Sequence, residues 1–414
     1  MQISIFNKPN RSRFVNTLCF LTAILLCSLS ISGCKVSNSV STQKSETKSH
    51  NALFLSTNSG EIDMSLPQIS ARAAILIDAD SGAVLLQKNS DEKMRMASTT
   101  KIMTALVALE HCGDITRTVS VSPKAVGVEG SSVYLCEGEQ LTLEELLYAM
   151  LLESANDAAA AIAIEIGGSI AGFAQMMNDK ATALGLYDTH FANPHGLDDD
   201  EHYTTARSLA IITAEAMKNE TFKEIVSTYK KTIPMGGADG ARLLINHNKL
   251  LNNYQGAVGV KTGYTKQSGR CLVSAAERDG LSLICVTLNA PDDWSDHRTL
   301  LDYGFSLYES RTLCEADEIK FKLPVVGGDP ECVVLTNTQA VKITVPKGAP
   351  EAECRIEAFD FEYAPIDQGE ICGKATFLIN GNRIAEVPLS AQYAVDQVKY
   401  KNSILERLWA LFKK

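Results

Sequence analysis

Three short stretches of the sequence combine side chains that could perform nucleophilic catalysis, and the first is Ser98-Thr-Thr-Lys101. If the apolar run at residues 102–109 is a helix, the hydroxyl and the amine lie one turn apart on the same face. A serine needs a base, and a lysine can act as that base where burial or a neighbouring cation lowers its pKa. The first turn of a helix favours an alkoxide and disfavours an ammonium. The same spacing also fits Ser98 or Thr99 as a helix cap beside a solvated lysine.

The second stretch is Ser154-Ala-Asn156, which separates two strongly helical patterns at residues 141–152 and 157–166. Short polar side chains at such a junction satisfy loose backbone groups, so a capping role is one interpretation. Beside Ser98 and Lys101, the other interpretation is that Ser154 relays a proton and Asn156 holds a substrate amide. The sequence leaves both interpretations open at this point.

The third stretch is Lys261-Thr262-Gly263, which opens an expected run of three antiparallel strands over residues 256–288. Gly263 has no side chain, so a ligand backbone could approach this strand closely. An extended peptide could then pair with the strand while Lys261 and Thr262 bind its terminal carboxylate. An ordinary bend would have the same composition.

The segments that must position these residues predict an α+β domain. Residues 73–78 and 83–86 flank Asp80-Ser-Gly82, which indicates a strand hairpin. The helix that carries Lys101 follows and is expected to end at Cys112-Gly113. Strands therefore precede and follow the helical stretches.

After residue 310 the sequence changes to short alternating runs and contains no catalytic combination. These runs are residues 319–323, 332–335, 341–345, 354–358 and 375–379. Asn380-Gly381 follows the last run and is a strong hairpin signal. We therefore predict a catalytic domain at residues 67–310 and a small all-β domain, similar to a β-sandwich, at residues 311–395. The second domain would raise the first above a membrane or bind partners.

Both ends of the chain carry membrane signals. Residues 1–33 have basic residues before an apolar run and predict an export signal. Cys34 follows Ile-Ser-Gly, which resembles a bacterial lipobox with lipidation at Cys34; an ordinary cleavage site or an uncleaved anchor is the alternative. Residues 34–66 are rich in Ser and Thr and predict a flexible tether. Residues 396–414 predict a basic amphipathic helix, which fits a membrane-surface anchor or a helix docked on the β domain.

Composition excludes several classes of function. The 414 residues carry a formal charge of -10, so the chain offers no basic field for nucleic acid. The four acidic residues at 198–201 lack the spacing of a calcium loop, and the histidines lack paired metal-ligand spacing. We expect neither a metal nor a cofactor. Cysteines are scattered, none sits in a motif with a base, and their disulfide state is left open.

Taken in this order, the three stretches are the signature of penicillin-binding proteins and class A β-lactamases. The sequence closely resembles the serine-type D-alanyl-D-alanine carboxypeptidases, the low-molecular-weight penicillin-binding proteins. The resemblance extends to Asn193-Pro-His-Gly-Leu, Thr204-Thr-Ala-Arg and Leu300-Leu-Asp-Tyr-Gly-Phe. It covers residues 67–310, with a weaker match to the end.

This resemblance implies a five-stranded antiparallel sheet covered by helices, with a mostly helical subdomain that carries Ser154 and Asn156. Ser98 would be the acyl-enzyme nucleophile and Lys101 its general base. Ser154 would belong to the proton relay, and Asn156 would hold the substrate. The backbone N–H of Ser98 would be one oxyanion donor, and the second donor is left open.

On the opposite wall of the cleft, the resemblance implies that Lys261, Thr262 and Gly263 bind the substrate and that Lys261 holds its carboxylate. The expected activity is removal of the terminal D-alanine from peptidoglycan stem peptides at the outer face of the cytoplasmic membrane, with β-lactams as inhibitors. A serine β-lactamase would share the nucleophile, but the Glu-x-x-Leu-Asn setting of its hydrolytic glutamate is absent between Ser154 and Lys261. A non-catalytic muropeptide-binding protein would need a broken motif, and all three stretches are complete.

Overall fold

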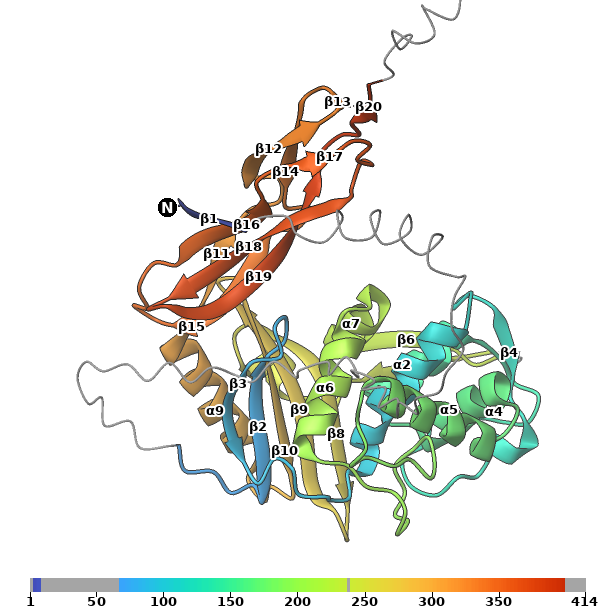
Figure 1. Ribbon diagram of the computed structural model, residues 1–414. Helices are drawn as coiled ribbons and strands as arrows, with labels where there is room; N and C mark the ends of the chain where they lie inside the picture. The colour runs from blue at the N-terminus through green and yellow to red at the C-terminus, as the bar shows by residue number, and fades with distance from the viewer. Residues whose placement is uncertain (1–2, 9–66, 237–238, 399–414) are drawn as a thin grey trace, which may run out of the picture. The chain divides into compact units, whose positions relative to one another are not determined.

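The computed structural model describes residues 3–8, 67–236 and 239–398, which form two compact units (Figure 1). One unit spans His50–Glu309, and the other joins Met1–Ser49 to Ser310–Lys414. The predicted tether with Cys34, the apolar part of the export signal and residues 399–414 of the predicted terminal helix lie outside the described residues. The boundary between the units coincides with the predicted end of the catalytic domain.

A five-stranded antiparallel sheet is the centre of the first unit, as the family resemblance predicts. Its strand order is β3-β2-β10-β9-β8. The strands are β2 (Ala73–Asp78), β3 (Val84–Lys88), β8 (Ala257–Thr265), β9 (Gly269–Arg278) and β10 (Leu281–Leu288). Asp279 and Gly280 both have positive φ, 51° and 79°, which suits the two-residue turn between β9 and β10. The strand β8, with Lys261, lies at an edge.

Helices cover both faces of this sheet, which explains why β2 is apolar from Ala73 to Ile77. Ile75 and Ile77 of β2 belong to the core beneath α2 (Lys101–His111), α6 (Ala206–Met217) and α7 (Glu220–Ser227). Leu76 points the other way and packs with Leu300 and Leu301 of α9 (Asp293–Leu307). A strand buried on both faces reads as a continuous hydrophobic run rather than an alternating one.

A helical region follows α2 and carries the second catalytic stretch. It contains α3 (Leu143–Leu152), α4 (Asn156–Gly167) and α5 (Ile170–Ala183). A capping box between Thr142 and Glu145 starts α3. Among the described residues no single helix could span a membrane; α4 and α5 together are apolar enough, but they meet at an angle of 81°.

Short elements complete the first unit. The single turns are η1 (Ala97–Thr100), η2 (Pro123–Ala125) and α8 (Leu250–Asn253). The two-stranded ribbons pair β4 (Thr118–Ser120) with β5 (Gln140–Thr142), and β6 (Lys230–Pro234) with β7 (Ala241–Ile245).

The second unit is all-β, as predicted, and its largest sheet has seven strands. The order is β1-β16-β18-β19-β14-β12-β17. The strands are β1 (Ile3–Lys8), β12 (Lys320–Val326), β14 (Cys332–Thr336), β16 (Glu353–Phe359), β17 (Glu362–Tyr363), β18 (Ile371–Ile379) and β19 (Asn382–Ala391). Asn380 and Gly381 have φ of 51° and 77°, so they form the predicted hairpin turn between β18 and β19.

Two ribbons flank the large sheet of the second unit. One pairs β11 (Tyr308–Cys314) with β15 (Val341–Pro346), and the other pairs β13 (Gly328–Asp329) with β20 (Asp396–Gln397). The terminal helix was predicted to start at residue 396, whereas residues 396 and 397 form β20. Leu323, Val333 and Phe377 are among the buried residues of this unit's core.

A buried carboxylate fastens the start of the described catalytic unit to α9. Asp296, 4% exposed, accepts hydrogen bonds from the backbone N–H groups of Ser70 (2.8 Å) and Ala71 (2.9 Å) and from the Ser70 hydroxyl (2.8 Å). These donors precede β2 directly. Asp296 therefore orients the chain as it enters the central part of the sheet.

We expect Asp296→Ala to lower the free energy of unfolding by about 1–3 kcal/mol, because it leaves the buried N–H of Ala71 without an acceptor and removes two further hydrogen bonds from Ser70. Chemical denaturation followed by circular dichroism measures this loss. Arg298→Ala, an exposed position on the same helix, is the control and should change little. Equal stability of the two variants would contradict the anchoring role of Asp296.

Candidate active site

Two threonine side chains stabilise the turn that carries Ser98, and neither of them binds the Ser98 hydroxyl. Ser98 lies in η1, immediately before α2. The hydroxyl of Thr99 donates to the carbonyl of Met96 (2.6 Å), and that of Thr100 donates to the carbonyl of Ala97 (2.7 Å). Neither η1 nor α2 has a side-chain N-cap. The capping interpretation of Ser98 is therefore wrong, because its hydroxyl contacts Lys101 instead.

Lys101 is fully buried, and its amine touches three oxygen atoms. Its Nζ lies 3.0 Å from Ser98 Oγ, 2.6 Å from Asn156 Oδ1 and 2.6 Å from the backbone carbonyl of His195. A neutral amine has two N–H donors and one lone pair. The donors suit Asn156 and the carbonyl, which leaves the lone pair for the Ser98 hydroxyl proton.

Burial and a second cation lower the pKa of Lys101 well below its usual value. Desolvation is the larger cause, and the charge of Lys261 adds to it, whereas Asp157 acts in the opposite direction. The solvated-lysine interpretation is therefore wrong as well. The geometry and the pKa direction together suit a lysine that accepts a proton from Ser98.

Asn156 is held from both sides. Its Oδ1 accepts from Lys101, and its Nδ2 donates to the carbonyl of Glu129 (2.5 Å). Gly130 has φ of 94°, and a Cβ there would lie 2.8 Å from Asn156 Nδ2, so only glycine fits without a shift. The second N–H of the amide stays available for a substrate carbonyl. Asn156 thus positions the base in addition to its predicted contact with substrate.

Ser154 lies in the kink between α3 and α4, with φ of 62°. It is buried, 5% exposed, and it is not among the three contacts of the Lys101 amine. The kink places Ser154 two residues from Asn156. Its role as a proton relay therefore stays a prediction.

The loop that follows η2 is fastened to this kink and to the β6–β7 ribbon. The Asp157 carboxylate accepts from the Ser132 hydroxyl (2.6 Å) and the Leu135 N–H (3.0 Å). On the other side, Arg242 donates to the carbonyl of Val133 (2.8 Å) and forms a largely buried ion pair with Glu139 (2.5 Å). These contacts fix the backbone that presents the Glu129 carbonyl to Asn156.

The Lys261 side chain is buried, 1% exposed, and its Nζ donates to the carbonyl of Thr262 (2.9 Å). Burial lowers the pKa of Lys261 to about 7. It is therefore a cation that loses its charge near neutral pH. Such a group suits the predicted capture of a substrate carboxylate in a site of low polarity.

Gly263 allows β8 to pass close to the turn that carries Ser98. A Cβ at Gly263 would lie 3.1 Å from the backbone N of Ser98 and 3.1 Å from the carbonyl O of Met96. The sequence prediction assigned this close approach to a ligand, and the structure assigns it to the protein's own turn. Since β8 is an edge strand, its outer backbone groups remain open to an extended peptide.

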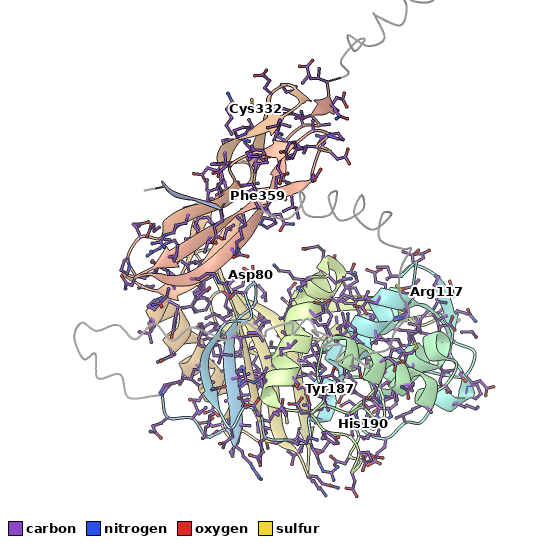
Figure 2. All side chains as sticks on the ribbon, in the orientation of Figure 1. Asp80, Arg117, Tyr187, His190, Cys332 and Phe359 are labelled. Atoms are coloured by element: carbon purple, nitrogen blue, oxygen red, sulfur yellow. The ribbon has the colours of Figure 1, made fainter. Side chains whose placement is uncertain are left out.

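Two histidines of the loop after α5 support the site. Figure 2 labels His190 near the start of this loop. His195 supplies the carbonyl to Lys101, and burial lowers the pKa of its imidazole to about 3. His202 Nδ1 accepts from the N–H of Ala192 (3.0 Å), so its Nε2 carries the proton toward the Thr100 hydroxyl (2.7 Å). His190, His195 and His202 all form hydrogen bonds through their rings within this loop.

Sequence reasoning missed the acceptors around Lys101 and Asn156. The carbonyl of His195 and the carbonyl of Glu129 are backbone groups, which every residue carries, so residue type gives no signal for them.

The acidic run at residues 198–201 has structural contacts: Asp198 accepts a hydrogen bond from Thr265 (2.9 Å), and Asp200 forms an ion pair with Arg95 (2.7 Å). Within residues 3–8, 67–236 and 239–398 no cluster suited to a metal occurs.

The comparisons with known proteins match both units. A family model for D-alanyl-D-alanine carboxypeptidase matches residues 60–292, and one for the C-terminal domain of penicillin-binding protein 5 matches residues 308–397. D-alanyl-D-alanine carboxypeptidase DacF of Bacillus subtilis is 34% identical over 83% of this chain and 91% of its own length. The DacA protein of Haemophilus influenzae is 31% identical over 86% of this chain and 92% of its own length.

Solved structures agree with these relatives. Penicillin-binding protein 5 from Haemophilus influenzae matches with a TM-score of 0.70 at 31% identity and covers 81% of this chain and 100% of its own. The Streptomyces K15 DD-transpeptidase matches with a TM-score of 0.57 at 34% identity, over 59% of this chain and 100% of its own. The chain thus has the fold of penicillin-binding protein 5, a domain of helices and an antiparallel sheet followed by an all-β domain.

The opposite charge states required of the two lysines generate a pH prediction. A base at Lys101 must be neutral, whereas Lys261 binds a carboxylate only below its pKa of about 7. We expect the second-order rate constant for acylation of Ser98 by penicillin to fall as pH rises through about 7. Stopped-flow or labelling rates between pH 5 and 10 measure this limb, since this constant reports groups of the free protein.

Lys261→Arg is the matched variant, because arginine stays charged over this range. It should move the falling limb to higher pH, whatever it does to the absolute rate. A falling limb that stays near pH 7 in Lys261→Arg would assign the titration to another group.

Proposed function

This chain belongs to the D-alanyl-D-alanine carboxypeptidases of peptidase family S11, and we propose that its reaction proceeds through an acyl-enzyme on Ser98. The proposed substrate is a peptidoglycan stem peptide that ends in D-alanyl-D-alanine. The observation that carries the residue assignment is the contact of 3.0 Å between Ser98 Oγ and the buried amine of Lys101. A hydroxyl next to a desolvated amine is an activated nucleophile.

In the acylation step, neutral Lys101 takes the proton of the Ser98 hydroxyl while Oγ attacks the carbonyl of the penultimate D-alanine. The peptide C–N bond then breaks, and the leaving D-alanine receives the proton. The Ser98 backbone N–H is the proposed donor to the developing oxyanion. In the second step a water molecule gives a proton to the same base and attacks the ester, which releases the shortened peptide and restores Ser98.

Substrate would lie against the outer edge of β8. Lys261 and Thr262 would receive its terminal carboxylate, and an extended stem peptide would add backbone hydrogen bonds along the edge strand. Asn156 retains an N–H for a substrate carbonyl. Ser154, buried in the adjacent kink, would pass a proton between the base and the leaving group.

We predict that a fluorescent penicillin labels the protein covalently and that Ser98→Ala abolishes the label, because the variant lacks the attacking oxygen. Intact mass spectrometry, followed by peptide mapping, locates the adduct. Circular dichroism of Ser98→Ala should match the parent, since Ser98 is only half buried. An adduct on another residue would refute the role of Ser98.

The same preparation should release D-alanine from a D-Ala-D-Ala pentapeptide while its penicillin adduct persists. The sequence lacks the Glu-x-x-Leu-Asn glutamate that would activate water beside a bulky penicilloyl group, and loss of a general base costs about 10²–10⁴ in rate. Rapid multiple turnover of penicillin without D-alanine release would favour a serine β-lactamase. Absence of both reactions would favour a non-catalytic muropeptide-binding protein.

We further propose that the protein is exported and held at the outer face of the cytoplasmic membrane. The apolar run at residues 15–31, Cys34 and the basic amphipathic stretch at residues 399–414 support this location. A single acyl chain or a single interfacial helix binds a bilayer weakly and reversibly, so two attachments hold far better than one.

Deletion of residues 403–414 should reduce membrane retention of the processed protein without changing turnover of a soluble peptide. The reason is that every catalytic stretch lies before residue 264. Fractionation of cells that express the parent, the deletion and the deletion with Cys34→Ala measures retention. Unchanged partition of the combined variant would contradict both attachments.

A further inference from the structure

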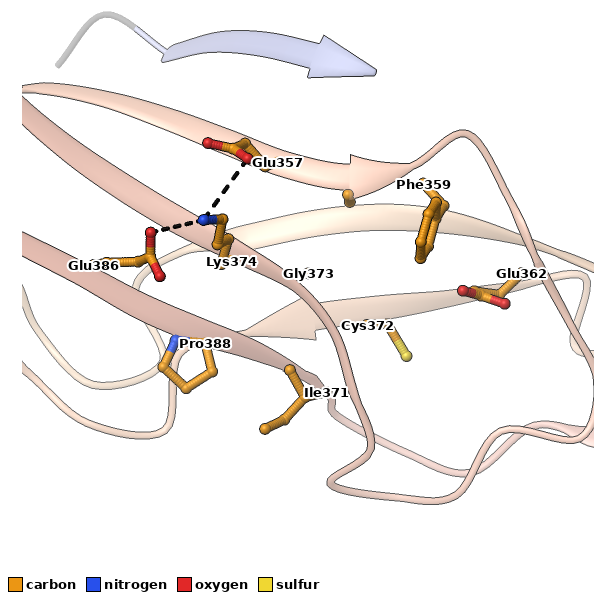
Figure 3. A pocket seen from close by; sticks show the side chains of 10 residues that line it. Glu357, Phe359, Glu362, Ile371, Cys372, Gly373, Lys374, Glu386 and Pro388 are labelled. Carbon is orange, nitrogen blue, oxygen red and sulfur yellow. Dashed lines mark hydrogen bonds and ion pairs between the residues drawn. The ribbon is translucent and has the colours of Figure 1, made fainter. Parts of the chain in front are cut away.

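The β domain carries a pocket that the catalytic reaction does not use. Its cavity measures about 490 Å³ and is lined by residues from the end of β16, the first residue of β17, the start of β18 and the middle of β19. Figure 3 shows Lys374 between Glu357 and Glu386, with Phe359, Cys372 and Ile371 toward the other end. The ion pairs thus lie at one end of the pocket, and the other end combines apolar side chains with the carboxylate of Glu362.

The apolar end is unusually open to solvent. Ile371 is 66% exposed and Phe359 is 40% exposed, and Figure 2 labels Phe359 on this unit. Val326 and Tyr363, 48% and 41% exposed, neighbour each other through the pairing of β12 with β17. Several large apolar side chains exposed together, rather than singly, indicate a surface that another segment covers.

The charged end has an excess of negative charge. Lys374 bridges Glu386 (2.7 Å) and Glu357 (3.8 Å), and Glu362 adds a third carboxylate to the lining. Arg383, outside the lining, also pairs with Glu386 (3.3 Å), so three carboxylates against two cations leave a net charge of -1. An occupant of this pocket should therefore combine an apolar stripe with cationic side chains.

The end of the described chain is connected to the pocket through β12 and β17. Val398 donates its N–H to the carbonyl of Gly327 (2.9 Å). Gly327 follows Val326, and Val326 of β12 pairs with Tyr363 of β17. Glu362, which precedes Tyr363 in β17, lines the pocket. The segment that begins at residue 399 therefore starts within a few residues of the pocket wall.

The sequence of that segment has the required chemistry. Residues 399–414 carry five basic side chains against Glu406, a net charge of +4. The apolar residues of this segment, spaced for one helical face, are Ile404, Leu405, Leu408, Trp409, Leu411 and Phe412. Sixteen residues of helix extend about 24 Å, which is enough to cross a pocket of this size.

We propose that residues 399–414 dock in this pocket of the same chain when no membrane is present. The apolar stripe covers Ile371 and Phe359, and the basic side chains face the carboxylates. Docking shields Trp409 and its neighbours from water. The segment must then leave the pocket before it can bind a lipid surface. Membrane attachment through this segment then competes with the docked state.

Trp409 reports on docking directly, because the protein has only two tryptophans, Trp294 and Trp409. Trp294→Phe leaves Trp409 as the single emitter. The indole Nε1 of Trp294 is buried without a hydrogen-bond partner among the described residues, so phenylalanine removes an unsatisfied donor there. All variants below carry Trp294→Phe in the processed, exported form of the protein.

We expect the emission maximum of Trp409 in the protein to lie at a shorter wavelength than that of the synthetic peptide 399–414, because docking shields the indole from water. Ile371→Asp should shift this maximum to a longer wavelength. The control is Leu243→Asp, another exposed apolar position at 55% exposure, which should leave the emission unchanged. Release of D-alanine from the pentapeptide, equal in all variants, verifies the catalytic unit, and far-UV circular dichroism verifies that the β domain with Ile371→Asp is folded. A loss of activity alone would bear on the proposed function and not on docking.

Three results would overturn the proposal. One is a Trp409 emission maximum in buffer at the same wavelength as that of the free peptide. This result, with a blue shift that appears only when anionic phospholipid vesicles are added, would assign the segment to the membrane alone. Another is blue emission that Ile371→Asp leaves unchanged. The third is emission that moves to the red on dilution, which would assign the segment to a second copy of the chain.

Discussion

The site depends on the burial of one amine. Lys101 lies at the start of α2 with no exposed surface, and desolvation lowers its pKa. A buried ammonium is costly, so the amine is stable there only because polar atoms are placed around it. Asn156 and the carbonyl of His195 occupy two directions, and Ser98 occupies the third. The contact that activates Ser98 is thus the contact that completes the hydrogen bonding of the lysine.

Three separate parts of the chain meet around this amine. The α3–α4 kink presents Asn156, the loop after α5 presents the His195 carbonyl, and η1 presents Ser98. Further hydrogen bonds hold two of these parts in place. Asp157 accepts from the loop that supports Asn156, and His202 binds Thr100 in the turn that carries Ser98. These outer contacts limit movement of the base, which a reaction with tight geometric demands requires.

The sequence predicted the parts of the site that depend on local spacing. Ser98 and Lys101 are one helical turn apart, and the apolar strands and the Asn380-Gly381 turn follow simple periodic rules. It did not predict the His195 carbonyl, 94 residues from Lys101, because a backbone oxygen has no residue signature. The absent side chain of Gly263 was noticed, but the neighbour that needs the space was not, since that depends on packing β8 against η1.

The charge states of the two buried lysines are linked. Desolvation is the larger cause of the lowered pKa of Lys101, and the charge of Lys261 adds to it. A carboxylate that binds Lys261 raises the pKa of that group by pairing with it. Lys261 would then stay charged at a pH where the free protein loses the proton. The same carboxylate would offset the charge of Lys261 felt at Lys101, so the neutral state proposed for the base would rest on its desolvation, which is the larger cause of its lowered pKa.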